Sequence, residues 1–150
     1  GLSEPDNSVE VAYCSHVVEH LDQEEAGRFI SELFRVLLPG GIVRLAVPDI
    51  KRKVEQYMES GDADDFIKST TMCRPYPKAI MGRIKFFFVG PRHHLWMYDG
   101  ASLSALLEKH GFVRAHEIPA GKTNIPNHEP LNLSERHPES VFVEAFKPQE

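Results

Sequence analysis

The sequence predicts an α/β fold in which helices flank a mostly parallel sheet, and three neighbouring segments carry this prediction. Residues 9–13 alternate apolar and polar side chains, residues 23–37 repeat apolar side chains at three- and four-residue steps, and residues 42–47 form an apolar run. These patterns are typical of a half-buried strand, an amphipathic helix and a strand covered on both faces. A strand, a helix and a second strand in this order form a βαβ unit, whose strands are parallel and whose crossover is right-handed.

The first strand and the helix after it have clear local signals. Val9, Val11 and Tyr13 are β-branched or aromatic, and such side chains favour an extended, half-buried segment. Asp22 is a helix N-cap, and Glu25 three residues later completes the pattern of a capping box. The apolar face of the helix is formed by Ala26, Phe29, Ile30, Leu33, Phe34 and Leu37.

A proline and two glycines separate this helix from the second strand. Pro39 disfavours a helical conformation at the residue before it, and Gly40 and Gly41 give the backbone the freedom to turn. The apolar run over residues 42–47 is broken only by Arg44.

The rest of the chain continues to alternate helices and strands. Asp49 is an N-cap for a helix that ends at Gly61, and Asp99 caps a later helix that ends at His110. Residues 84–89, with three successive phenylalanines that we interpret as core, fit either a strand or a buried helix. The other expected segments are a short helix over 63–68, a break at 74–77, a strand over 112–118, a long loop over 120–138 and a last strand over 140–146.

Length and composition indicate one globular domain over residues 1–150. Hydrophobic residues make up 41% and charged residues 26%, which is ordinary for such a domain. The net charge of −5 comes without an extended basic face, so we expect no nucleic-acid partner. Cys14 and Cys73 are too few for a disulfide framework, which favours a cytoplasmic protein. Because no apolar run approaches the roughly 20 residues of a membrane span, we expect no membrane association either.

Three stretches of the sequence together resemble a known family. They are Asp6-Asn7-Ser8-Val9-Glu10-Val11, Ser15-His16-Val17-Val18-Glu19-His20-Leu21 and Phe34-Arg35-Val36-Leu37-Leu38-Pro39-Gly40-Gly41. In this order they resemble the second half of a class I S-adenosylmethionine-dependent methyltransferase. The later segment His93-His94-Leu95-Trp96-Met97-Tyr98 is similar to that of small bacterial members.

The resemblance implies a partial Rossmann-like methyltransferase sheet, S-adenosylmethionine as the cofactor and a small molecule as the methyl acceptor. The strands at Val9 and Ile42 would be the fourth and fifth of the family's sheet, and the final strand, from Ser140, would run antiparallel to the others. The family's glycine-rich cofactor loop lies upstream of the segment that resembles Asp6. We therefore expect this chain to lack the first strands of the fold and to be inactive, or only part of the active enzyme.

Candidate site residues follow from the strand order. In open parallel sheets, ligands sit beyond the carboxyl ends of the strands, which here means residues 14–20 and 48–49. The resemblance implies that Cys14, Ser15 and His16 border the cofactor. Our candidates for proton transfer are His16, His20 and His94, and those for acceptor binding are Glu19, Trp96 and Tyr98. The alternative for the second segment is that Leu95 and Trp96 belong to the core and that His93 and His94 are surface residues.

Two further interpretations compete with the methyltransferase. His16, Glu19 and His20 spell H-x-x-E-H, the signature of inverted zinc proteases, which would make the protein a zinc hydrolase. The alternative is that Glu19 and His20 brace the loop through hydrogen bonds, and we assign no metal ligand. The other interpretation is a non-catalytic remnant that forms a homodimer, because the strand from Val9 to Tyr13 would become an exposed edge.

Overall fold

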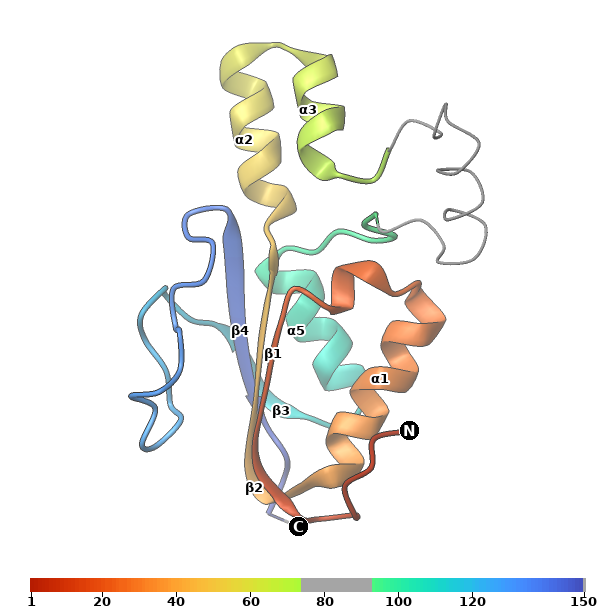
Figure 1. Cartoon of the computed structure of the whole chain (residues 1–150), viewed down its shortest axis with the longest axis vertical. Coiled ribbons are helices and arrows are strands. Elements are labelled where there is room, and N and C mark those ends of the chain that lie inside the picture. The colour runs from red at the N-terminus through yellow and green to blue at the C-terminus, as the bar shows by residue number, and fades with distance from the viewer. Residues whose placement is uncertain (74–92, 150) are drawn as a thin grey trace, which may run out of the picture.

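The computed structural model describes residues 1–73 and 93–149 (Figure 1). The break expected at 74–77 and the phenylalanine segment at 84–89 lie outside the described residues. The helices and strands are β1 (Val9–Ser15), η1 (Val18–His20, a 3-10 turn), α1 (Gln23–Val36), β2 (Leu37–Pro48), α2 (Ile50–Ser60), α3 (Ala63–Thr70), α5 (Gly100–Lys109), β3 (Val113–Glu117) and β4 (Ser140–Phe146).

The four strands form one mixed sheet in the order β1-β2-β4-β3. β1 and β2 are parallel, and β4 is antiparallel to both of its neighbours, β2 and β3. β1, β2 and β3 therefore run in one direction, and the last strand is inserted among them in the opposite direction. The sheet confirms the predicted fold class, including the antiparallel last strand.

Helices cover one face of the sheet, and the loop before β4 covers the other (Figure 1). On the helix side, Val43, Leu45 and Val47 of β2 belong to one core cluster with residues of α1 and α5, among them Ile30 and Leu103. On the loop side, a smaller cluster consists of Ala46, Ile118 and Phe142, with Tyr13 and Ala120 packed against it. The run in β2 is thus apolar because both of its faces are covered.

The predicted helix caps are confirmed. The Asp22 carboxylate accepts from the Glu25 N–H at 2.8 Å, and the Glu25 side chain accepts from the Asp22 N–H at 3.1 Å. Asp49 caps α2 and Asp99 caps α5, and α2 ends at Gly61, whose φ of 68° is in the left-handed region.

The expected turn at Pro39-Gly40-Gly41 is instead an irregularity inside β2. Val9 pairs with Leu37 but Val11 pairs with Ile42, so three extra residues bulge from β2 while its pairing with β1 continues. Gly40 has a φ of 80°, and a Cβ on Gly41 would lie 2.8 Å from a backbone oxygen. The glycines were correctly interpreted as flexible points, but the second strand begins earlier than predicted, at Leu37 instead of Ile42.

α2 and α3 form a helical hairpin that projects beyond the end of the sheet (Figure 1). α2 buries none of its residues, and its Tyr57 packs against Phe66 of α3 with ring centroids 5.4 Å apart. Within the described residues, no helix has the length and apolar character that a bilayer crossing requires.

Candidate functional site

The candidate site begins where β1 ends, at the carboxyl ends of the two parallel strands. The His16 N–H donates to the Ala46 carbonyl at 2.8 Å, which is the last contact of β1 with β2. His16 then adopts a φ of 54°, and this left-handed conformation turns the chain sharply into η1. The turn places the side chains of residues 16–20 above the strand ends, as the sheet topology predicted.

Glu19, His16 and Ser140 form a buried hydrogen-bonded chain. His16 Nδ1 lies 3.0 Å from Glu19 Oε1, and His16 Nε2 lies 3.1 Å from Ser140 Oγ. Since a carboxylate only accepts, Nδ1 carries the proton in the bond to Glu19, and Nε2 shares a hydrogen bond with the Ser140 hydroxyl. The order Ser–His–Glu is that of a hydrolase triad, but Ser140 is buried, so the chain of bonds serves to fix the Glu19 carboxylate.

The backbone of Glu19 holds the second predicted segment in place. Its carbonyl accepts from the N–H groups of Leu95 at 2.8 Å and Trp96 at 3.2 Å. The Tyr98 carbonyl then accepts from the Ile50 N–H at 2.9 Å, at the start of α2. Residues far apart in sequence thus meet at one end of the sheet.

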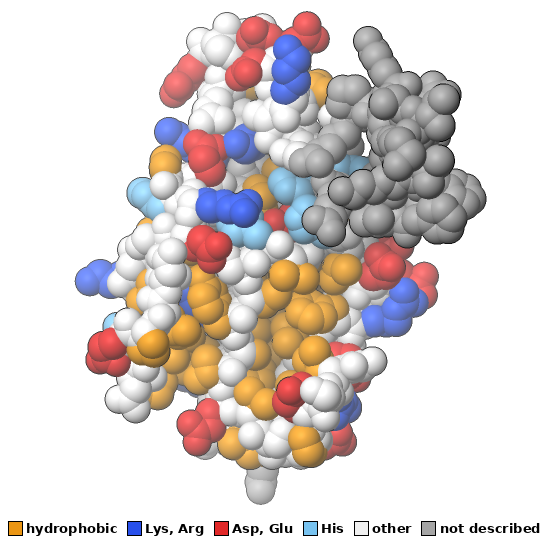
Figure 2. Space-filling view, viewed as in Figure 1, with side chains coloured by type: hydrophobic (Ala, Val, Ile, Leu, Met, Phe, Trp, Pro, Cys, Tyr) orange, Lys and Arg blue, Asp and Glu red, His pale blue; other side chains and the backbone are white. Residues whose placement is uncertain are grey.

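His20 and His94 lie against each other at the surface of this site. Their rings are 5.0 Å apart between centroids in an edge-to-face arrangement. His20 Nδ1 donates to the His93 carbonyl at 3.1 Å, and His94 Nδ1 donates to the Thr70 carbonyl at 2.8 Å. Burial lowers the pKa of His94, which favours its neutral form. Figure 2 shows histidine side chains gathered on this face below α2 and α3.

Of the residues that the resemblance assigned to the cofactor, Cys14 and Ser15 differ in whether the side chain has a polar group available for a ligand. The Cys14 side chain packs against the helix-side core, and burial together with the nearby Glu19 raises its pKa to about 11. Cys14 is therefore a neutral thiol and no nucleophile. Ser15 Oγ is buried and has no hydrogen-bond partner among the described residues.

The segment after His94 corrects one interpretation. Trp96 and Leu95 are 41% and 39% exposed, so the alternative that both belong to the core is wrong. Tyr98 is the core aromatic residue of this segment. Burial raises the pKa of Tyr98, and the charge of Glu19 adds a smaller effect in the same direction. Tyr98 belongs to the helix-side core cluster together with Leu103 and Leu107 of α5, whereas Trp96 does not.

The zinc-hydrolase interpretation requires two imidazoles on one face of a helix, and the structure does not build this arrangement. η1 covers only residues 18–20, His16 lies before it in a left-handed turn, and both ring nitrogens of His16 are hydrogen-bonded. The bracing interpretation fits better, because Glu19 holds His16 through its side chain and residues 95–96 through its backbone. Ser140 and Thr70 were missed by the sequence analysis, and no local pattern marks either as a site residue.

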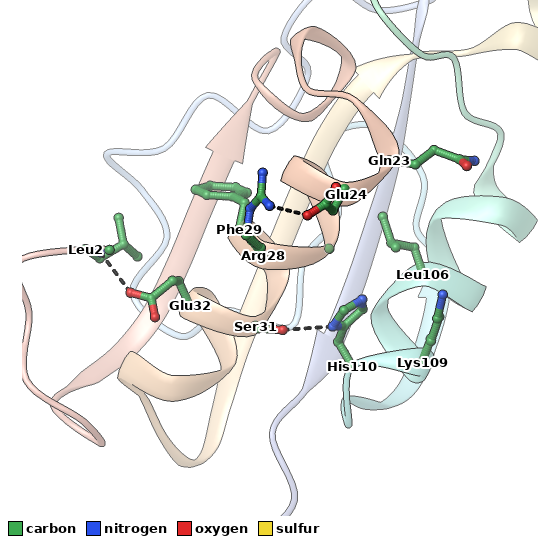
Figure 3. A pocket seen from close by; sticks show the side chains of 12 residues that line it. Leu2, Gln23, Glu24, Arg28, Phe29, Ser31, Glu32, Leu106, Lys109 and His110 are labelled. Carbon is green, nitrogen blue, oxygen red and sulfur yellow. Dashed lines mark hydrogen bonds and ion pairs between the residues drawn. The ribbon is translucent and has the colours of Figure 1, made fainter.

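A separate groove of about 890 Å³ lies between α1 and α5 (Figure 3). Its walls include Arg28, Phe29 and Leu106, and Ser31 Oγ lies 2.9 Å from His110 Nδ1 across it. None of the predicted site residues lines this groove. Its position beside the helices, away from the strand ends, separates it from the candidate site.

The comparison with protein families supports the resemblance seen in the sequence. Residues 2–45 match the family model described as a methyltransferase domain. The match covers less than half of the 150 residues and shows what this segment is similar to. The segment contains β1, α1 and most of β2, and hence one side of the candidate site.

Solved structures share the fold of this chain over nearly all of its length. A methyltransferase from Methanosarcina mazei described as S-adenosylmethionine-dependent has 20% identity and a TM-score of 0.57, covering 100% of this chain and 64% of its own. One from Archaeoglobus fulgidus has 17% identity and a TM-score of 0.51, with 97% and 62% covered. A chain from the complex of a Haloferax volcanii putative methyltransferase with the activator Trm112 has 13% identity and a TM-score of 0.55, with 100% and 58% covered.

The chain thus spans about three fifths of the length of these relatives, and their low identities establish a shared fold. No curated protein matches the sequence.

Proposed function

We propose that this chain is the C-terminal part of an S-adenosylmethionine-dependent methyltransferase that acts on a small molecule. The observation that carries the proposal is the match of residues 2–45 to a methyltransferase domain, continued by a sheet with an antiparallel strand between β2 and β3. The likeness to methyltransferase structures over nearly the whole chain supports it.

One unsatisfied polar atom is consistent with a cofactor at the end of β1. Ser15 Oγ is buried without a partner among the described residues, and a buried hydroxyl without a hydrogen bond costs about 1–3 kcal/mol. A ligand with polar groups at this strand end would satisfy the hydroxyl. Cys14 would contribute through its backbone, because its side chain packs into the core, and His16 would border the site through its ring.

S-adenosylmethionine, when bound, supplies an electrophilic methyl group. The chain's own residues would then orient the acceptor and remove its proton. We propose His94 as the proton acceptor, because its lowered pKa leaves it neutral and its Nε2 carries a free lone pair when Nδ1 donates to Thr70. His20 would act beside it, and the exposed Trp96 would contact the acceptor. The side chains of Glu19 and Tyr98 are buried, so these residues would support the acceptor site without contacting the acceptor. His16, held at both nitrogens, would position Glu19.

Titration calorimetry with S-adenosylhomocysteine tests the cofactor proposal. We expect binding to the 150-residue chain that weakens about tenfold in Ser15→Ala, because one buried hydrogen bond of about 1.4 kcal/mol is lost. Ser31→Ala, on α1 away from the strand ends, is the matched control and should bind as the wild type does. Absence of heat at millimolar ligand would contradict cofactor binding by this chain.

We also propose a homodimer formed through the edge of β1. Within the described residues β1 is an edge strand, with β2 on one side only. The groups of β1 that face the open side would pair with the same strand of a second copy. Dimer formation is independent of methyl transfer and would persist in a non-catalytic remnant.

The free Cys14 and Cys73 support a reducing compartment such as the cytoplasm.

A further inference from the structure

We propose that Glu19, His20 and His94 form a binding site for a divalent transition-metal ion, for which Zn²⁺ is the natural probe. One ligand atom from each of the three side chains lies within 4.8 Å of the other two. A carboxylate and two imidazoles are the donor set of many zinc sites with three protein ligands. This site is distinct from the H-x-x-E-H interpretation, because His16 is excluded and His94 comes from a distant segment.

The hydrogen bonds of both imidazoles prepare them as ligands. The acceptors of His20 Nδ1 and His94 Nδ1 are backbone carbonyls, of His93 and Thr70 respectively, so Nδ1 carries the proton on each ring. In the neutral ring the lone pair is then on Nε2. Metal-binding histidines usually donate their other ring N–H to a carbonyl or carboxylate in this way, which fixes the tautomer and the ring orientation.

Glu19 provides the observation that points to a cation. Its side chain is fully buried, yet Oε2 has no hydrogen-bond partner among the described residues. The other oxygen, Oε1, is held by His16, which is held in turn by Ser140. A buried carboxylate oxygen without a partner is costly, and metal coordination is one of the few ways to compensate it. The bonded oxygen supplies the outer-shell support that ligating carboxylates generally have.

The backbone keeps the two parts of the site in register. The Glu19 carbonyl accepts from the N–H groups of Leu95 and Trp96, the two residues after His94. These hydrogen bonds hold the ligands of η1 close to the ligand of the later segment. Around a tetrahedral Zn²⁺ with bonds of about 2.0–2.1 Å, ligand atoms are about 3.3 Å apart. Because the three ligand atoms lie within 4.8 Å of one another, a shift of at most about 1.5 Å brings them to this spacing, and rotation of the exposed His20 ring can provide it. Three protein ligands would leave the fourth position of a tetrahedral ion for water.

Direct metal binding to the full 150-residue chain tests this site. We expect about one Zn²⁺ per chain by equilibrium dialysis with metal analysis, and a visible absorption spectrum of tetrahedral type when Co²⁺ replaces it. His94→Ala, His20→Ala and Glu19→Gln should each weaken binding about tenfold or more. His116→Ala, which removes an exposed histidine on β3, is the matched control and should bind like the wild type.

Far-UV circular dichroism of each variant separates loss of a ligand from loss of the fold. His20→Ala is decisive, because its side chain is exposed and its removal leaves the core intact. Substoichiometric Zn²⁺ in the folded wild type, or equal affinity in wild type and folded His20→Ala, would overturn the proposal. Neither measurement uses S-adenosylmethionine, so the outcome does not depend on cofactor binding. A metal ion on His94 Nε2 would occupy the lone pair proposed above as the proton acceptor, so proton transfer by His94 would belong to the metal-free form.

Discussion

Arg44 and Glu144 lie opposite each other on β2 and β4, and both side chains are completely buried. Arg44 Nη1 donates to Glu144 Oε1 at 2.7 Å and to the Lys122 carbonyl at 2.9 Å, while Nη2 donates to the Leu133 carbonyl at 3.0 Å. The guanidinium also lies 4.9 Å from the Phe142 ring centroid. This one residue therefore ties the long loop before β4 to the centre of the sheet.

Replacement of Arg44 by methionine is expected to lower the free energy of unfolding by about 3–5 kcal/mol, because Glu144 would remain as a buried charge without its cation. Urea unfolding measures the loss. Arg28→Met is the control: its exposed pair with Glu24 should contribute about 0–1 kcal/mol. The double variant Arg44→Met, Glu144→Leu should recover part of the loss, and a double variant worse than the sum of its parts would contradict this account.

Glu144 should also make stability depend on pH. Burial raises the pKa of Glu144, but hydrogen bonds from Thr123, Asn124 and Arg44 outweigh this and lower the pKa below its ordinary value of 4.5. The folded state therefore favours the ionised form, so its contribution is complete above pH 4.5 and is lost as the pH falls through the lower folded pKa. In urea unfolding from pH 7 to pH 3, Glu144→Gln should flatten the loss of stability below pH 4.5. Glu24→Gln should follow the wild type, and a Glu144→Gln curve parallel to the wild type would refute the assignment.

At the scale of elements, the hairpin of α2 and α3 differs from α1 in how much of it is buried. α1 buries five of its residues, whereas α2 buries none. An isolated helix of about 11 residues is marginal in water, so α2 depends on its contact with α3 and on its cap at Asp49.

Amides of α2 are therefore expected to exchange with deuterium well before those of α1 and β2, because local opening of the hairpin exposes little apolar surface. Hydrogen exchange followed by mass spectrometry gives the comparison directly, with α1 as the matched helix. Equal protection in α1 and α2 would mean that the hairpin is covered by another surface in solution.

At the scale of the whole molecule, β1 is an edge strand among the described residues, and we propose this edge as the surface of association. The direction of backbone groups alternates along a strand, and the His16 N–H points to β2. The N–H and C=O groups of Val11 and Tyr13 therefore point to the open side. Such an edge favours pairing with a second strand.

Light scattering should show a dimer that Val11→Lys converts to a monomer, since a charge at the edge opposes strand pairing. Met58→Lys, at a residue of α2 that is 76% exposed, is the control and should leave the dimer unchanged. A wild-type monomer at the highest accessible concentration would refute the homodimer.

The elements of the fold could be predicted because their signals are local. Asp22 with Glu25, Asp49 with Gly61, and Asp99 satisfy helix ends within a few residues, and the alternation of β4 is visible residue by residue. The start of β2 was not predictable in this way, because Gly40 and Gly41 mark a turn in most contexts. Here, pairing with β1 carries the strand through them.

The sequence by itself determined the α/β class, the caps, the residues at the end of β1 and the resemblance to methyltransferases. Only the tertiary structure decided which of these residues meet: Ser140 with His16, His94 with His20, and Arg44 with Glu144. The physical reason is that caps and periodicity depend on neighbours within one or two turns. Burial and partnership of polar side chains depend on where the sheet brings distant segments together.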